Sequence, residues 1–257
     1  MKQPTPRTLI FDIETSHDIL ASYGLREQYH SPESILQDWY IICAKWKWNG
    51  GKRIYGTSVL DDMKRFKKDN TNDYVVIKAL HELMSDVDIV VGHNIHRFDW
   101  KMFYTRVMFH RLPPLKMPQF ICTLKETKKI SRHSSHSLKH LARYYKLTSQ
   151  KIEHSRGMGI KILKGDIKAT QECVDYCGGD IATTEEYYEF IKPYMIGHPN
   201  LNLWRADGIE CCVKCGDTDI QKRGFRTTVS GKFQSYQCQG CGSWMQGTRS
   251  IKRVAIR

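Results

Sequence analysis

The chain has 257 residues, with 40 lysines and arginines against 27 aspartates and glutamates, and a net charge of +13. The length suits one large domain, alone or with a small appendage, and the composition, 40% hydrophobic and 26% charged, is that of a globular protein and excludes a disordered chain. The longest apolar run has about six residues, which excludes a membrane span of about 20 and a secretory signal. We therefore expect a soluble, cytoplasmic protein whose charge favours a polyanionic partner.

The hydrophobic pattern alternates between strands and helices over the first 200 residues. In chain order it predicts a strand over 8–14, strands over 38–48 and 52–55, a helix over 72–84, a strand over 88–91, and helices over 98–109, 137–145 and 169–191. The second and third strands flank a Gly-containing turn and predict a hairpin, while Gly178-Gly179 weakens the last helix. This order predicts an α/β fold, with a mixed sheet flanked by helices.

Acidic residues recur at the ends of these elements. Asp12 and Glu14 lie two apart at the end of the first strand, so their carboxylates share a face, where open α/β sheets bind ligands. Asp99 lies near the start of a helix, and Tyr176 and Asp180 are four apart on one helix face. Taken singly, each of these signals has an ordinary structural explanation: a solvent-facing pair of acids on the strand, a helix-dipole partner at Asp99, and a surface pair on the last helix.

Taken together, these motifs resemble those of the DEDD superfamily of 3′–5′ exonucleases, in the tyrosine branch (DEDDy). Residues 11–15, 92–99 and 176–180 are similar to the three motifs of that family, and residues 137–142 are similar to its Ser-Leu-x-x-Leu-Ala helix. The resemblance extends over roughly residues 7–195. It implies a ribonuclease-H-like fold and the hydrolysis of phosphodiester bonds at 3′ ends with two Mg²⁺ or Mn²⁺ ions.

The resemblance also implies roles for individual side chains. It assigns the two ions to the carboxylates of Asp12, Glu14, Asp99 and Asp180. Tyr176 would orient the attacking water, and Cys177 is expected to serve only packing because the two-metal reaction needs no thiol nucleophile. Asn94 and Phe98 would either contact the terminal nucleotide or hold the second motif in shape, and the residues leave both options open.

The last 60 residues contain a separate cysteine pattern. Two C-x-x-C-G knuckles place thiols at Cys212, Cys215, Cys238 and Cys241. Four thiolates in two such pairs are typical of a structural Zn²⁺ site, and the glycine after each knuckle suits a turn with positive φ. Cys211 is an alternative to Cys212. We predict an exonuclease domain over residues 1–197 and a mostly β zinc ribbon over 198–257 that needs its metal to fold.

The predicted ribbon is more basic than the rest of the chain, with 10 lysines and arginines against 4 acids over residues 198–257. Cations alternate there with aromatic residues, which suits the backbone and bases of a single-stranded nucleic acid. The candidate contacts are Lys222, Arg223, Arg226 and Lys232. Alternatively, the aromatic residues form a small core and the cations are solvated.

The sequence therefore indicates a 3′–5′ exonuclease that acts on DNA 3′ ends, mainly single-stranded. An exoribonuclease is the alternative with the same site, and a non-catalytic nucleic-acid-binding adaptor is the alternative of another class. We expect a monomer without membrane contact, with a replication or repair partner. Similar compact exonucleases with ribbons are typical of bacterial and phage genomes.

Overall fold

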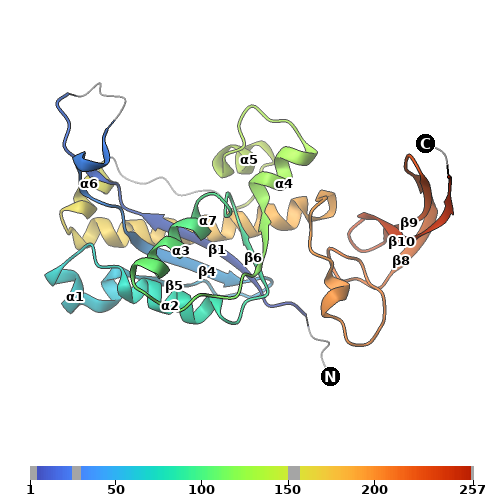
Figure 1. The fold of residues 1–257 in the computed structure, drawn as a ribbon, viewed down its shortest axis with the longest axis horizontal. Coiled ribbons are helices and arrows are strands. Elements are labelled where there is room, and N and C mark those ends of the chain that lie inside the picture. Colours follow the sequence, from blue (N-terminus) through green and yellow to red (C-terminus); the bar gives the residue numbers. More distant parts are fainter. Residues whose placement is uncertain (1–4, 25–29, 150–156, 256–257) are drawn as a thin grey trace.

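A five-stranded sheet in the order β5-β4-β1-β6-β7 forms the centre of the body (Figure 1). The computed structural model describes residues 5–24, 30–149 and 157–255. The strands of the sheet are β1 Thr8–Thr15, β4 Ile41–Trp48, β5 Tyr55–Ser58, β6 Ile89–Gly92 and β7 Gln119–Cys122. β4 runs antiparallel to β1 and to β5, whereas β6 runs parallel to β1 and to β7.

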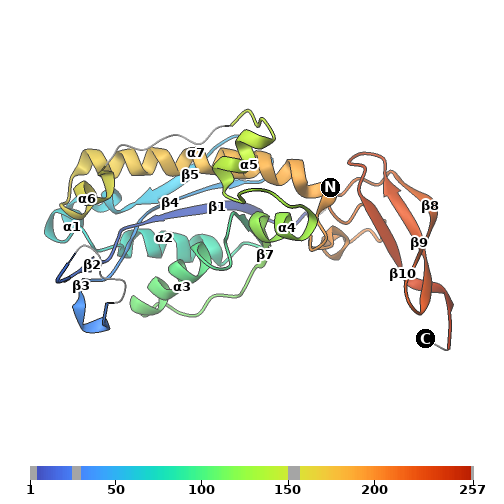
Figure 2. The ribbon, with the colours of Figure 1, turned by 90° about the horizontal axis from the view of Figure 1, so that it is seen from above.

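Helices cover both faces of this sheet (Figure 2). α2 (Tyr74–Met84) and α3 (Asp99–Phe109) lie on one face, and the long α7 (Ile167–Ile191) crosses the other. The remaining elements of the body are short: β2 Ile19–Leu20, η1 Pro32–Ser34, β3 Ile35–Gln37, η2 Val59–Asp62, α1 Met63–Lys68, α4 Thr123–Ile130, α5 Leu138–Tyr144, α6 Met158–Leu163 and η3 Lys192–Tyr194.

The side chains of β1 divide between two core clusters. Leu9 and Phe11 pack with α2 and α3 in one cluster, whereas Ile10 packs with α5 and α7 in the other. Because side chains alternate along a strand, Asp12 and Glu14 share the face of Ile10. The strand is covered on both sides, which explains why its sequence is largely apolar apart from these two acids and the terminal threonines.

The sheet order and the two helical layers confirm the predicted mixed α/β fold of the ribonuclease-H-like kind. The predicted hairpin also forms, with Trp46 opposite Tyr55, but its second strand begins at Tyr55 rather than at residue 52. α7 continues unbroken through Gly178-Gly179, because the packing of a long helix face outweighs the low helix propensity of two glycines. β7 was not predicted, since four residues are too few to show a period.

The C-terminal part forms a separate antiparallel sheet that stands away from the body (Figure 1). We call this sheet the arm; its strands are β8 Ile220–Thr227, β9 Gly231–Cys238 and β10 Trp244–Arg253. Before it, η4 (Leu201–Trp204) places Leu201 and Trp204 against the core cluster of α5 and α7. In the parts of the chain that the structure describes, no helix has the length and apolar character to cross a membrane.

Candidate active site and metal centre

The carboxylates of Asp12 and Glu14 lie at the C-terminal half of β1, on the face that α7 covers. Asp12 is opposite Lys45 of β4, and Glu14 is opposite Cys43. The register between β1 and β4 shifts after Glu14, so the regular ladder ends directly beyond the second acid. The strand therefore presents two carboxylates at the point where the regular pairing of the sheet stops.

Asp99 reaches the same point from the start of α3. Its Oδ1 accepts a hydrogen bond of 3.3 Å from the backbone N–H of Ile13, between the two acids of β1. The preceding turn depends on Asn94, whose φ of 73° is left-handed and whose carbonyl oxygen accepts hydrogen bonds from Arg97 and Phe98 N–H groups. Asparagine tolerates this conformation better than most residues. The backbone of Asn94 thus holds the second motif in shape.

The third motif lies in the middle of α7. Asp180 is buried on the face of the helix that packs on the sheet, and Tyr176, one turn earlier, is half-buried. Tyr176 and Glu14 together line a cavity of about 490 Å³ that continues toward α6. The structure therefore brings Asp12, Glu14, Asp99 and Asp180 to one place from three elements, and Tyr176 to its edge.

The electrostatics of the cluster reflect burial and crowding of like charges. Burial raises the pKa of Asp12 well above its ordinary value, and the nearby Cys177, Asp99, Glu14 and Asp180 raise it further. Burial also raises the pKa of Asp99 to about 7, although hydrogen bonds from backbone N–H groups act against the rise. Carboxylates that resist ionisation in this way are suited to a site where cations compensate their charge.

Cys177 belongs to this site as well as to the core, which the sequence did not reveal. Its Sγ lies 3.6 Å from Asp12 Oδ2 and 3.8 Å from the Asp12 carbonyl oxygen. Ligand atoms of Asp12, Glu14 and Cys177 all lie within 4.8 Å of one another. The expectation that Cys177 serves only packing is therefore incomplete, because its thiol also lies against the carboxylate of Asp12 on β1.

Two further residues of the second motif have distinct surroundings. His93 bonds through both ring nitrogens, Nδ1 to Thr123 Oγ1 and Nε2 to the His136 carbonyl oxygen, each at 2.9 Å. It therefore ties the loop before α3 to the start of α4 and to the segment before α5. Phe98, next to Asp99, keeps 38% of its surface exposed, so its ring is accessible beside the acidic cluster.

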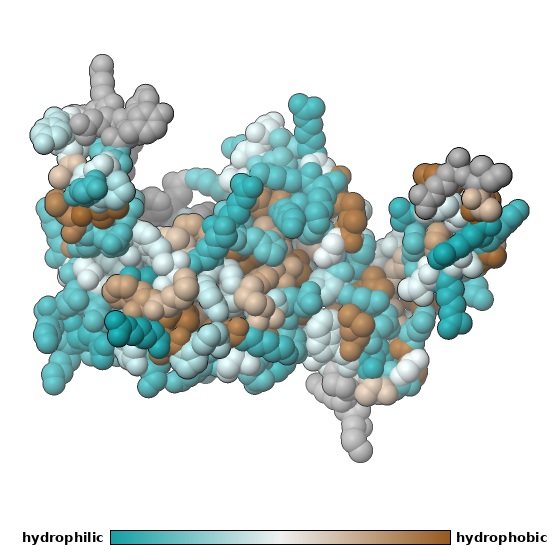
Figure 3. Space-filling model, in the orientation of Figure 1, coloured by the Kyte–Doolittle hydropathy of each residue, from teal (hydrophilic) through white to brown (hydrophobic). Residues whose placement is uncertain are grey.

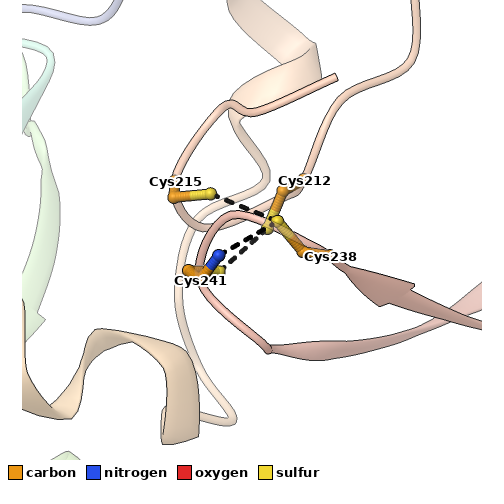
Figure 4. Close-up of side chains that lie close together, drawn as sticks. All are labelled: Cys212, Cys215, Cys238 and Cys241. Carbon is orange, nitrogen blue, oxygen red and sulfur yellow. Dashed lines mark hydrogen bonds between the residues drawn. The ribbon is translucent and has the colours of Figure 1, made fainter. Parts of the chain in front are cut away.

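The four predicted zinc cysteines converge in the C-terminal part (Figure 4). The Cys212 and Cys241 sulfurs are 3.7 Å apart, and the Cys215 and Cys238 sulfurs are 3.6 Å apart. A tetrahedron with Zn–S bonds near 2.3 Å has edges of about 3.8 Å. The donor set and its spacing therefore fit one Zn²⁺.

The backbone around these cysteines repeats in both knuckles. Gly216 and Gly242 have φ of 81° and 74°, and their N–H groups donate to the Cys212 and Cys238 carbonyl oxygens at 3.0 Å. This bears out the prediction that glycine follows each knuckle because φ is positive. Cys211 points elsewhere: its backbone bonds Asn202, and it is not one of the four clustered cysteines.

A bulge in β8 separates the basic residues of the arm. Lys222 is opposite Tyr236 and Arg226 is opposite Phe233, and these partners on β9 are three residues apart. Directly paired side chains share a face and successive ones alternate, so Lys222 and Arg226 lie on opposite faces. Lys232 shares the face of Lys222. Arg223 lies within the bulge, before Gly224.

Comparison with known proteins agrees with this fold. No protein-family model matches the chain, and no curated protein matches its sequence. Among solved structures, the family B DNA polymerase from the hyperthermophilic archaeon Pyrobaculum calidifontis is similar, with a TM-score of 0.52 and 17% sequence identity. The match covers 74% of this chain and 25% of that one, so this chain spans about a quarter of the polymerase. At this identity the similarity shows a shared fold.

Proposed function

We propose that the protein is a metal-dependent 3′–5′ exonuclease that hydrolyses phosphodiester bonds at the 3′ ends of DNA, with single-stranded DNA as its main substrate. The observation that carries the proposal is the convergence of four carboxylates from β1, α3 and α7, a cluster in which burial and neighbouring acids raise the pKa of Asp12 and of Asp99. The fold shared with a DNA polymerase supports DNA as the substrate class. It also supports a partner in replication or repair.

The chemistry of the cluster fits hard divalent cations, which prefer oxygen ligands. Mg²⁺ or Mn²⁺ would be held by the carboxylates of Asp12, Glu14, Asp99 and Asp180. Two such ions, when bound, supply an activated water and compensate the charge on the leaving oxygen. Each carboxylate therefore acts mainly as a ligand, and none needs to act as a nucleophile.

Other side chains would position the substrate and the water. The Tyr176 phenol, beside Glu14, would hold the attacking water by a hydrogen bond, because a Tyr pKa near 10 suits a donor better than a base. The exposed Phe98 ring next to Asp99 would stack on the terminal base. We assign the cysteine cluster to one structural Zn²⁺ and the chain to a monomer with a domain boundary at residues 197/198.

Asp180→Asn should lower the release of nucleotides from 5′-labelled single-stranded DNA with Mn²⁺ by about 10³-fold or more, equivalent to about 4 kcal/mol of transition-state stabilisation. Asp12→Ala should have a similar effect, since both acids lie in the cluster. Asp175→Asn is the matched control: Asp175 is exposed on the same helix and accepts a hydrogen bond of 2.9 Å from Gln171. It should keep wild-type activity.

The product pattern distinguishes the alternatives. A ladder from 5′-labelled DNA supports 3′–5′ polarity, whereas internal cuts contradict it. Faster hydrolysis of the same sequence as RNA would identify an exoribonuclease. If folded Asp180→Asn and wild type released nucleotides equally fast, the proposed site would be wrong, and if wild type released none, a binding adaptor would be the better interpretation.

A further inference from the structure

A groove of about 970 Å³ lies between the arm and the end of the body. Its lining includes Tyr145, Phe190, Tyr194, Lys214, Arg226 and Trp244. The space-filling view shows the corresponding notch between the arm and the body (Figure 3). Lys214 joins the two sides at its base, because the buried Nζ donates a hydrogen bond of 2.7 Å to the Pro193 carbonyl oxygen.

Both walls of the groove carry accessible aromatic rings. On the body, the rings of Tyr145 and Phe190 have centroids 4.6 Å apart, and those of Phe190 and Tyr194 are 6.4 Å apart, so they form a row. On the arm, Trp244 is the facing ring. Tyr194 and Trp244 keep 65% and 58% of their surfaces exposed. Rows of exposed rings are suited to stacking with the bases of a single strand.

The charge of the arm complements a phosphate backbone. From Ile220 to Arg253 the chain has seven lysines and arginines and no aspartate or glutamate. The register places Arg226 and Trp244 on the same face, because their partners on β9, Phe233 and Gln237, are four residues apart. The face that lines the groove thus combines a cation with an indole ring.

The groove lies at a useful distance from the carboxylates. α7 carries both Asp180 and Phe190, and ten residues of helix span about 15 Å. A stacked strand rises about 3.4 Å per nucleotide, so about four or five nucleotides would bridge this distance. We propose that the groove binds the single strand of the substrate, upstream of the 3′-terminal bond. This proposal about substrate binding rests on the proposed nuclease function.

Two matched variants test the groove. Trp244→Ala and Phe225→Ala each remove an exposed ring from the arm. Phe225, however, lies on the face of the arm that does not carry Trp244: it pairs with Gln234 of β9, and Lys232 Nζ lies over its ring. Binding of 5′-fluorescein-labelled dT15 would be measured by anisotropy without added Mg²⁺ or Mn²⁺. We expect Trp244→Ala, and likewise Tyr194→Ala, to weaken binding by about 5- to 100-fold, whereas Phe225→Ala stays within about twofold of wild type. Equal zinc content and circular dichroism show that the variants are folded.

Substrate length provides the second measurement. A trinucleotide is too short to reach the groove, so kcat/KM for it should be the same in wild type and Trp244→Ala. For a 15-mer, kcat/KM should fall with the binding. Three results would overturn the proposed role of the groove. They are an equal loss of dT15 affinity in Phe225→Ala, an equal loss of kcat/KM on the trinucleotide in Trp244→Ala, and wild-type dT15 affinity in folded Trp244→Ala and Tyr194→Ala.

The two proposals fail separately. Hydrolysis by wild type with no effect of Trp244→Ala or Tyr194→Ala on binding would retain the nuclease and reject the groove. If dT15 binding depended on Trp244 and Tyr194 but wild type hydrolysed no DNA, the proposal for the groove would stand and the proposed nuclease function would be wrong.

Discussion

Asp99 shows how one buried carboxyl group links the site to stability. Its side chain is 2% exposed, lies at the first turn of α3 and accepts the N–H of Ile13 on the central strand. The N–H donors favour its charged form, but burial and the neighbouring Asp180 disfavour it more strongly, and its pKa rises to about 7. When a buried acid with a raised pKa ionises without a cation nearby, the folded state becomes less stable.

Without added Mg²⁺ or Mn²⁺, the protein should lose stability as the pH rises. The folded state holds the Asp99 proton more tightly than the unfolded chain, in which the pKa is near the ordinary 3.8. The stabilisation is therefore complete below about pH 4 and disappears as the pH rises through about 7. Scanning calorimetry should show the unfolding temperature falling across this interval.

Asp99→Asn should flatten this decline, because the amide carries no titrating charge. Adding Mg²⁺ at pH 8 should raise the unfolding temperature of wild type more than that of the variant. Asp175→Asn, on the exposed face of α7, should keep the wild-type slope. A variant with Asn at position 99 and an undiminished slope would assign the pH dependence to other groups.

Among the elements, one buried acid joins three pieces of the body. Asp73 precedes α2 and is 0% exposed. Its Oδ2 accepts from Arg106 Nε at 2.7 Å and from Ile41 N–H at 3.0 Å, while Oδ1 accepts from Arg106 Nη2 at 2.8 Å and bonds His110 at 2.6 Å. The start of α2, the start of β4 and the end of α3 therefore share one carboxylate.

Asp73→Ala should lower the free energy of unfolding by about 3–5 kcal/mol, because it leaves the buried Arg106 without its counter-charge. Urea denaturation measures this loss. Burial acts to raise the pKa of Asp73, but the hydrogen bonds of His110 and Arg106 outweigh it and lower the pKa. The stabilisation is therefore present above the ordinary pKa of 3.8 and is lost as the pH falls below it.

An aspartate that caps a helix at the surface provides the control. Asp62 accepts the N–H of Arg65 at 2.9 Å at the start of α1, but its side chain keeps 36% of its surface exposed. Asp62→Ala should cost only about 1 kcal/mol, the usual value of a cap. Equal losses in the two variants would mean that burial of the ion pair is not what stabilises this junction.

At the scale of the whole molecule, the body and the arm depend on different forces. Two large apolar clusters stabilise the body. In the arm, by contrast, only Ser235 and Cys238 are buried among all residues of β8, β9 and β10. A sheet with so little apolar burial cannot offset its conformational entropy alone, so its fold should depend on the metal held by the knuckles.

Cys238→Ser should reduce the zinc content from about one ion per chain to less than one-tenth. Limited trypsin digestion should then cut the arm at Lys222, Arg223 and Arg226, while the body resists. Cys211→Ser is the control, since Cys211 is buried next to a ligand but outside the cluster. Retained zinc and an intact arm in Cys238→Ser would refute the metal site.

Local patterns in the sequence determined much of this protein. Alternation and helical spacing predicted β1, β4, β6 and the helices α2, α3, α5 and α7, because buried faces require a regular period. The positions of the acids on these elements and the two C-x-x-C-G knuckles followed from spacing over a few residues. Such features are local, so the chain alone specifies them.

Other features depended on contacts between distant segments. Simple alternation along β8 would place Lys222 and Arg226 on one face, but the bulge between Lys222 and Phe225 separates them. The thiol of Cys177 meets Asp12 across 165 residues, and the groove needs both the end of α7 and β10. Register, bulges and the docking of an arm on a body are set by tertiary packing, which no local period encodes.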